Sequence, residues 1–380
     1  MNLKEGYKQT EIGVIPEDWE VTKLGEVLKI QTGKKNAQDA VANGEYPFFT
    51  RSVDTQKINT YSHDTEALFI AGEGNFAVKY YKGKFDIHQR TYMLTSIKDN
   101  NVDLKFLQNS IQPRIFRLIA TSVGSTVQSL RKPIIENLKI PLPPLKEQKK
   151  IAEILSTVDE KIAFVDKSIE EAQTLKKGLM QKLLTEGIGH TEFKESELGR
   201  IPKEWKVEIV KNVVSLTSGK FNPKKNLSEE KNDSFIYPVY GGNGITGYFT
   251  DFLIDYPTII IGRVGEYCGS VHIIKKPLWV TDNAIYIKKI KETVLLDYLY
   301  LLFDYIGLEN LAEKTGQPKI TQEPIYNIKF TLPPFEEQKQ IAEILSTTDE
   351  KLENLKAKKE AFEELKKGLM QKLLTGEIRV

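Results

Sequence analysis

Basic and amide side chains gather in two turn-rich parts of this 380-residue chain. The candidates in the first part are Lys34, Lys35, Arg51, Gln89, Arg90, Gln128 and Arg131. Those in the second part are Lys220, Lys224, Lys225, Asn243, Arg263, Gln317 and Lys319. Lysine ammonium groups bind phosphates, whereas Arg, Asn and Gln carry the paired groups that match base edges. The two clusters therefore indicate contact with a nucleic acid, although any one of these residues alone more often makes a local turn bond.

The overall charge gives this interpretation little support. The chain has 54 Lys and Arg against 52 Asp and Glu, a net charge of +2. Affinity for nucleic acid comes largely from the neutralisation of phosphates by basic side chains. Any contact must therefore come from local basic clusters, and a partner protein could add further positive surface.

Motifs for catalysis are missing from the sequence. It contains neither an Asn/Asp-Pro-Pro-Tyr/Phe methyltransferase motif nor a G-x-x-x-x-G-K-[ST] phosphate loop. The histidines are scattered without the spacing of metal ligands, at His63, His88, His190 and His272. Cys268 is the single cysteine, and we expect it to be a small buried apolar residue. We therefore expect a non-catalytic chain that binds no metal and no cofactor of its own.

A long internal repeat organises the chain around the two clusters. The segment IAEILSTVDEK at 151–161 returns as IAEILSTTDEK at 341–351, and LKKGLMQKLLT at 175–185 returns unchanged at 365–375. A weaker repeat pairs 13–19 with 199–205. The order is A–B–A′–B′, in which B is nearly fixed and A diverges. Such an order suggests recognition of two different things at a set separation.

The B segments have the spacing of coiled-coil helices, with apolar residues every 3.5 positions. The first seam consists of Ile151, Leu155, Val158, Ile162, Val165, Ile169, Leu179 and Leu183. The second consists of Ile341, Leu345, Leu352, Leu355, Phe362, Leu369 and Leu373. Because one such helix leaves its seam exposed, we expect the two to pair. An antiparallel pair would carry the A segments at opposite ends. Gly178 and Gly368 inside the helices indicate either a close helix contact or a bend.

The A segments have the pattern of mixed, mostly β modules. Short apolar runs lie between turn residues, at 67–71, 258–262, 271–274 and 284–287, and helix-like stretches follow at 104–119 and 295–311. We predict recognition modules at 1–145 and 187–335 and helices at 146–186 and 336–380. We find no apolar run long enough to span a membrane and no signal-peptide pattern in the first residues, so we expect a cytoplasmic protein.

Two longer motifs connect the chain to a known family. PLPPLKEQKKIAEILSTVDEKI and TLPPFEEQKQIAEILSTTDEKL resemble the conserved repeats of the specificity subunits (HsdS) of type I restriction–modification systems. YPVYGGNGITGY, IIIGRVG and WVTDNA resemble one form of their target recognition domain, and YPFFTRS with GKFDIHQRTY resembles another. The resemblance extends over essentially the whole chain.

The resemblance implies an α+β fold with an internal pseudo-twofold repeat, in which two α/β target recognition domains are joined by two long antiparallel coiled-coil helices. It implies that each domain reads one half of a bipartite, asymmetric site in double-stranded DNA. It also implies partners: two modification subunits that bind S-adenosylmethionine and methylate adenine, and restriction subunits that use ATP and Mg²⁺. The helices would set the spacing and dock the modification subunits.

Two other hypotheses remain open at this point. One is a fused nuclease or methyltransferase whose active site the motifs do not reveal, which methyl transfer by the isolated chain would show. The other is a plain oligomerisation coiled coil with no role on DNA, which would not require the A segments to diverge while the B segments stay the same.

Overall fold

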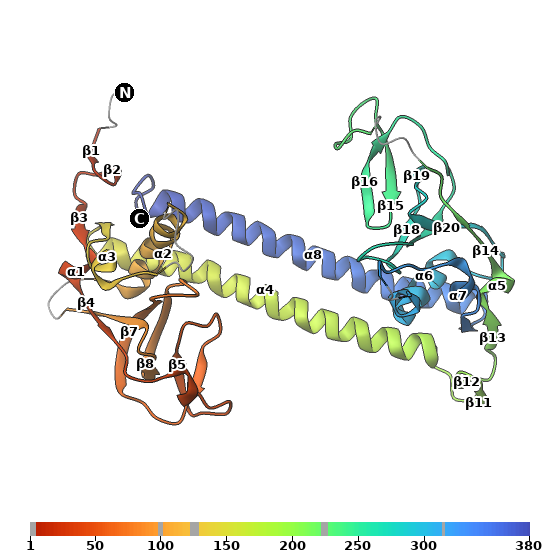
Figure 1. Ribbon diagram of the computed structural model, residues 1–380, viewed down its shortest axis with the longest axis horizontal. Coiled ribbons are helices and arrows are strands. Elements are labelled where there is room, and N and C mark those ends of the chain that lie inside the picture. The colour runs from red at the N-terminus through yellow and green to blue at the C-terminus, as the bar shows by residue number, and fades with distance from the viewer. Residues whose placement is uncertain (1–4, 98–101, 122–128, 222–226, 314–315) are drawn as a thin grey trace. The chain divides into compact units, whose positions relative to one another are not determined.

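The computed structural model describes residues 5–97, 102–121, 129–221, 227–313 and 316–380, which form two compact units (Figure 1). Unit 1 comprises Met1–Asp166 and Ala357–Val380, and unit 2 comprises Lys167–Lys356. The division falls inside the two long helices, so each unit contains one recognition module and part of each helix. The candidates Gln128, Lys224 and Lys225 lie outside the described residues.

The module of unit 1 is built on a six-stranded sheet with the order β4–β9–β7–β8–β5–β6, antiparallel except where β5 meets β8. These strands are β4 (Leu28–Thr32), β5 (Tyr46–Phe49), β6 (Gln56–Ile58), β7 (His63–Ala71), β8 (Lys79–Ile87) and β9 (Thr91–Ser96). Two further antiparallel pairs are β1 (Tyr7–Thr10) with β2 (Gly13–Pro16) and β3 (Glu20–Lys23) with β10 (Lys139–Leu142). The helices are α1 (Leu24–Val27), α2 (Leu104–Thr121) and α3 (Lys132–Glu136), with a 3-10 turn at Ala37–Asp39.

The module of unit 2 repeats this plan with a divided sheet. One sheet has the order β14–β20–β17–β18, from β14 (Val214–Ser218), β17 (Thr258–Gly262), β18 (Val271–Ile274) and β20 (Ala284–Ile290). The other has the order β16–β15–β19, from β15 (Tyr237–Gly241), β16 (Gly244–Phe249) and β19 (Trp279–Val280). The outer pairs are β11 (Phe193–Ser196) with β12 (Gly199–Pro202) and β13 (Lys206–Ile209) with β21 (Lys329–Leu332). The helices are α5 (Val210–Val213), α6 (Leu296–Ile306) and α7 (Gln322–Tyr326), with a 3-10 turn η3 at Leu308–Leu311.

The predicted strand and helix runs of both modules are confirmed. The apolar run at 67–71 forms the buried end of β7, and the run at 258–262 forms β17, all five residues of which are buried. The helix-like stretch at 295–311 is divided, because Gly307 has a φ of +71° and ends α6 before the 3-10 turn. Cys268 is buried in the apolar core of this module, as expected.

The long helices are α4 (Leu145–Thr185) and α8 (Phe335–Leu373). In unit 1 the start of α4 and the end of α8 pack with the module in one apolar cluster that holds Ile151, Leu155 and Leu373. In unit 2 the end of α4 and the start of α8 form the corresponding cluster with Leu183 and Ile341. Every predicted seam residue is buried or half-buried. The expected pairing of two long helices is therefore confirmed.

Three interhelical ion pairs fix the antiparallel register. In unit 1, Lys366 contacts Asp159 at 2.6 Å and Lys359 contacts Asp166 at 2.7 Å, so residue numbers rise along α4 as they fall along α8. In unit 2, Lys176 contacts Asp349 at 2.7 Å. Lys176 and Lys366 are copies of one another in the repeat, as are Asp159 and Asp349. The same polar contact thus occurs once in each unit.

The Pro-Pro-x-x-Glu-Gln sequence before each repeat anchors a module to a long helix. Glu147 accepts a hydrogen bond from Trp19 Nε1 at 3.0 Å, and its copy Glu337 accepts one from Trp205 Nε1 at 2.8 Å. The next residue is a buried glutamine in both copies. Gln148 Oε1 accepts the N–H of Asp103 at the start of α2, and Gln338 Oε1 accepts the N–H of Leu295 at the start of α6. The weakly repeated segments at 13–19 and 199–205, which contain the tryptophans, therefore contact the strongly repeated helix starts.

For Gly178 and Gly368 the sequence suggested either a close helix contact or a bend, and the prediction of a close contact is wrong. A Cβ added at Gly178 or at Gly368 meets no described atom within 4 Å, and both helices run through these positions without a break. Among the described residues, no helix is long and apolar enough to cross a membrane.

Candidate nucleic-acid interface

In unit 1 the loops that carry the candidate residues meet near the start of β9. Lys35 forms a β-bridge with His88, and the Gln89 N–H donates to Lys35 O at 2.9 Å. Gln89 Nε2 donates to Asn36 Oδ1 at 2.7 Å. The loop after β4 and the loop after β8 are thereby joined. Lys34, Gln89 and most of their neighbours are exposed, so their polar groups are accessible to a ligand.

Arg51 and Arg90 contact the same carboxylate, that of Glu73, which the sequence alone did not mark. Arg51 Nη1 donates to Glu73 Oε1 at 2.7 Å, and Arg90 Nη1 donates to the same oxygen. The hydrogen bond from Arg90, with a further one from Arg51, holds the pKa of Glu73 below its usual value. Glu73 directly follows the apolar run of β7 between two glycines, and that placement is the signal by which a sequence search could have found it.

His88 holds the loop that carries Arg90. Its side chain is buried, and its Nδ1 accepts the N–H of Arg90 at 3.0 Å. Burial lowers the pKa of His88, and the charges of Arg51 and Arg90 lower it further. The ring is therefore neutral near pH 7 and acts as a structural acceptor that shapes the loop carrying Arg90.

The segment before α3 completes the surface in unit 1. Ser129 forms a β-bridge with Glu73, and the Leu130 N–H donates to Gly72 O at 2.7 Å. Arg131 follows directly and is exposed. A hollow of about 200 Å³ opens between the loops. It is lined by Ala37, Thr50, Arg51, Ser52, Gln56, Gly74 and His88.

Unit 2 assembles its loops through equivalent backbone contacts. The Gly72 N–H donates to Arg90 O in unit 1, and the Arg263 N–H donates to Asn283 O in unit 2, at 2.9 and 3.0 Å. The Ile320 N–H donates to Arg263 O, as the Leu130 N–H does to Gly72 O. Val264 forms a β-bridge with Lys319, as Glu73 does with Ser129. Lys319 and Arg263 therefore lie on neighbouring loops.

The remaining candidates of unit 2 lie on turns of the same module. Asn243 is exposed in the turn between β15 and β16, and Gln317 is exposed shortly before Lys319. Arg263 is half-buried, with Nη1 at 3.5 Å from Ser218 Oγ. Lys220 is exposed, and its N–H donates to Val280 O at 2.9 Å.

Close backbone approach explains the glycine before a candidate lysine in both units. A Cβ on Gly33 would lie 1.9 Å from Ile87 O, and one on Gly219 would lie 2.1 Å from Thr281 O. Real side chains do not tolerate such distances, so only glycine lets the chain pass here. Lys34 and Lys220 directly follow these glycines, so the close backbone approach also fixes their positions.

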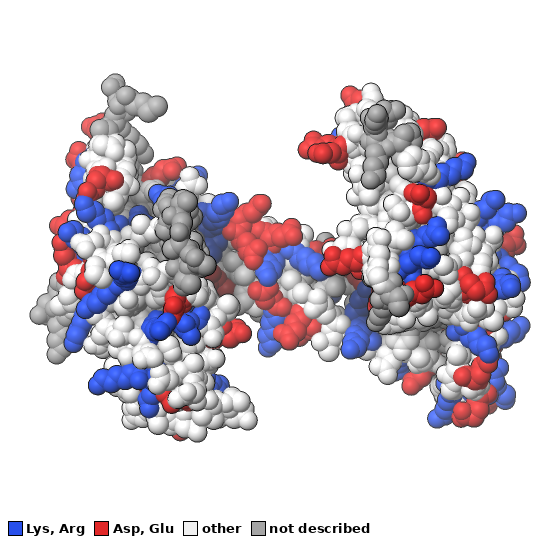
Figure 2. Space-filling view, viewed as in Figure 1, with Lys and Arg blue, Asp and Glu red and all other residues white. Residues whose placement is uncertain are grey.

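The two surfaces thus share a backbone plan and differ in their side chains. Position by position, unit 1 has Gly72, Glu73 and Ser129 where unit 2 has Arg263, Val264 and Lys319. On the face drawn in Figure 2, basic and acidic side chains are interspersed, in keeping with the net charge of +2. In the described part of the chain, no group of three or more His, Cys, Asp or Glu side chains is placed to hold a metal ion.

Comparison with known proteins decides the family. The profile of the type I restriction modification DNA specificity domain matches residues 16–174 and again residues 202–364. The chain belongs to the family of type I restriction–modification specificity subunits. The MjaVIII specificity subunit of Methanocaldococcus jannaschii is 31% identical, with 99% of this chain and 97% of the relative covered. The EcoDI specificity subunit of Escherichia coli is 27% identical over 87% of this chain and 81% of the relative.

A solved structure supports the fold of this specificity subunit. The crystal structure of the S subunit from M. genitalium aligns with a TM-score of 0.73 at 19% identity, covering 98% of each chain. The fold class expected from the sequence, with two α/β modules, two long paired helices and an internal repeat, is therefore confirmed.

Proposed function

We propose that this specificity subunit reads a bipartite, asymmetric sequence in double-stranded DNA. One half is read by the loop surface of the first module and the other half by that of the second. The observation that carries this proposal is the shared backbone plan with different side chains at corresponding positions. A common scaffold with changed Arg, Lys, Asn and Gln groups is the arrangement expected of two readers with different base preferences.

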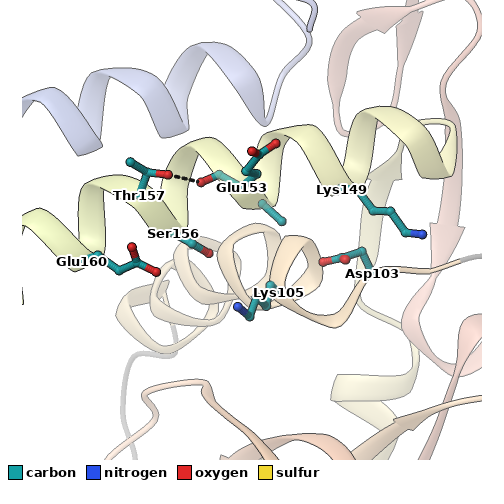
Figure 3. Close-up of a pocket in the computed structure, with 8 residues that line it drawn as sticks. Asp103, Lys105, Lys149, Glu153, Ser156, Thr157 and Glu160 are labelled. Atoms are coloured by element: carbon teal, nitrogen blue, oxygen red, sulfur yellow. Dashed lines mark hydrogen bonds between the residues drawn. The ribbon is translucent and has the colours of Figure 1, made fainter.

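The long helices offer a surface on which modification subunits can dock. In unit 1 a groove of about 320 Å³ lies between the start of α2 and α4, and Figure 3 shows the side chains that line it. Six residues of α4 line this groove, namely Lys149, Ala152, Glu153, Ser156, Thr157 and Glu160. Their copies on α8 are Lys339, Ala342, Glu343, Ser346, Thr347 and Glu350, identical at all six positions. We call these two sets the repeated polar faces.

The repeated polar faces are identical where folding does not demand it. Lys149, Glu153, Thr157 and Glu160 are exposed, and so are their copies. Exposed positions usually tolerate substitution at little cost. Elsewhere on these helices exposed residues have changed between copies, as where Phe164 corresponds to an asparagine. A shared partner accounts for the identity, so we infer that each face docks one modification subunit and that two such subunits bind.

The chemistry of the complex is assigned to the partners. We propose that the modification subunits bind S-adenosylmethionine and transfer the methyl group, and that restriction subunits use ATP and Mg²⁺. The specificity subunit itself is then a non-catalytic component that works in the cytoplasm. Its relatives carry the name of specificity subunit of a type I restriction enzyme.

Methylation sequencing tests the proposal. The full chain is expressed with its modification subunit in a host that lacks other adenine methylation, and methylated sites are mapped across the genome. We expect one motif made of two short specified parts and an unspecified gap. Methylation at a single continuous motif, or methyl transfer by the specificity chain alone, would contradict the proposal.

A further inference from the structure

Glu73 contacts two arginines on the loop surface of unit 1 and is less exposed to solvent than either of them. Its side chain is 19% exposed, whereas those of Arg51 and Arg90 are 43% and 61% exposed. A ligand that arrives from solvent therefore meets the guanidinium groups first. The carboxylate contacts both of them from the protein side.

The backbone next to Glu73 holds the same two arginines. The Gly72 N–H donates to Arg90 O at 2.9 Å, and the Asn75 N–H donates to Arg51 O at 3.2 Å. The loop at 72–75 thus binds each arginine twice, once at its main chain and once at its guanidinium group. The position and the direction of both side chains depend on this one loop.

The energetic role of the carboxylate follows from the chemistry of arginine. Two guanidinium groups that share one oxygen repel each other, and each long side chain has many rotamers in solution. A half-buried carboxylate offsets the repulsion and restricts the rotamers before a ligand arrives, which lowers the entropy lost on binding. Reading guanine requires a guanidinium group in one bidentate geometry, whereas a phosphate accepts many geometries.

We propose that Glu73 is a positioning residue for base discrimination: it holds Arg51 and Arg90 so that they read base edges rather than the backbone of DNA. This inference rests on the proposed function. Unit 2 has Val264 at the corresponding backbone position, so the effect is confined to the half-site that the first module reads.

The test replaces Glu73 with glutamine, which keeps the shape and removes the charge. The full chain, purified with its modification subunit, selects duplexes from a random-sequence DNA library and is titrated with a random-sequence duplex. We expect glutamine to lower discrimination about tenfold at one or two base pairs of one half-site. Binding to the random duplex should stay equal or increase, because a negative charge has been removed near phosphates. Glu73→Asp retains the charge and should lie closer to the wild type.

A matched control separates this role from a general effect of charge. Glu11→Gln removes an equal charge and one ion pair, with Lys139, and should leave both half-sites unchanged. Unchanged discrimination in Glu73→Gln would overturn the inference. So would a parallel loss of specific and random-sequence binding with a lower melting temperature, since that pattern marks a purely structural residue. A wild-type complex that selects no two-part motif would instead refute the proposed function and this inference with it.

Discussion

Glu147 joins three parts of unit 1, and its replacement by alanine tests how a module is held on its helix. The carboxylate lies in the first turn of α4 with only 7% of its side chain exposed. It accepts one hydrogen bond from Trp19 Nε1 at 3.0 Å and two from Arg379, at 2.7 and 2.9 Å. Arg379 also contacts Asp18, so the chain end, the Trp segment and α4 meet at one point.

The expected cost follows from the burial of each partner. Trp19 is fully buried, so its indole N–H is left without an acceptor at a cost of about 1–3 kcal/mol. The Arg379 side chain is 42% exposed and keeps its pair with Asp18, so its share is below about 1 kcal/mol. Glu147→Ala should therefore lower the stability of unit 1 by about 1–4 kcal/mol. Glu147→Gln keeps one acceptor and should cost about half as much or less.

Hydrogen exchange of the intact chain, followed peptide by peptide, measures this cost in each unit separately. Glu147→Ala should lower the protection of peptides around Trp19 and the start of α4. Glu337→Ala is the mirror variant, because Glu337 accepts from Trp205 and His190 in unit 2. It should lower protection in unit 2 alone. Unchanged exchange in unit 1 of Glu147→Ala, or an equal loss in both units, would refute this account of the anchor.

Three further predictions test other parts of the fold. Gly33→Ala forces a Cβ against a carbonyl of β8 and should destabilise unit 1 by about 1–3 kcal/mol, whereas Gly178→Ala has open space and should stabilise its helix by up to about 1 kcal/mol, both measured by denaturant unfolding. Because burial lowers the pKa of His88, the unfolded chain binds its proton more readily, so melting temperature should fall as pH drops below about 6.5; His88→Gln should weaken that dependence. Asp159→Lys opposes Lys366 and should cost about 0.5–1 kcal/mol, which the double exchange with Lys366→Asp should largely restore; equal stability of the single and double variants would contradict the pairing.

The helices were readable from the sequence because their burial is periodic. A spacing of 3.5 residues depends only on local helix geometry, so seam residues such as Leu155 and Leu345 could be named in advance. The ion pairs that lysines form between the two helices could not be predicted from the sequence. Lys176 occupies a seam position in place of an apolar residue, and only the register of the partner helix shows that Asp349 lies opposite.

The sequence showed which loops carry the candidate residues, but it did not show which loops contact one another. Each cluster was visible because Gly, Lys, Arg and Gln follow apolar strand runs. Sheet order then decides which loops meet, and the order of the six-stranded sheet is not sequential. Glu73 was missed for that reason, since its two arginines come from loops 22 and 17 residues away in the sequence. Whether the named residues contact bases stays a prediction.

A module exchange tests the central claim most directly. Residues 1–145 are replaced by the corresponding module of a relative with a different DNA motif, and the chimera is expressed with the modification subunit for methylation sequencing. Two independent readers predict that one half of the motif changes to that of the donor while the other half stays the same. A change in both halves, or in neither half of an active complex, would contradict the claim that each module reads its own half-site.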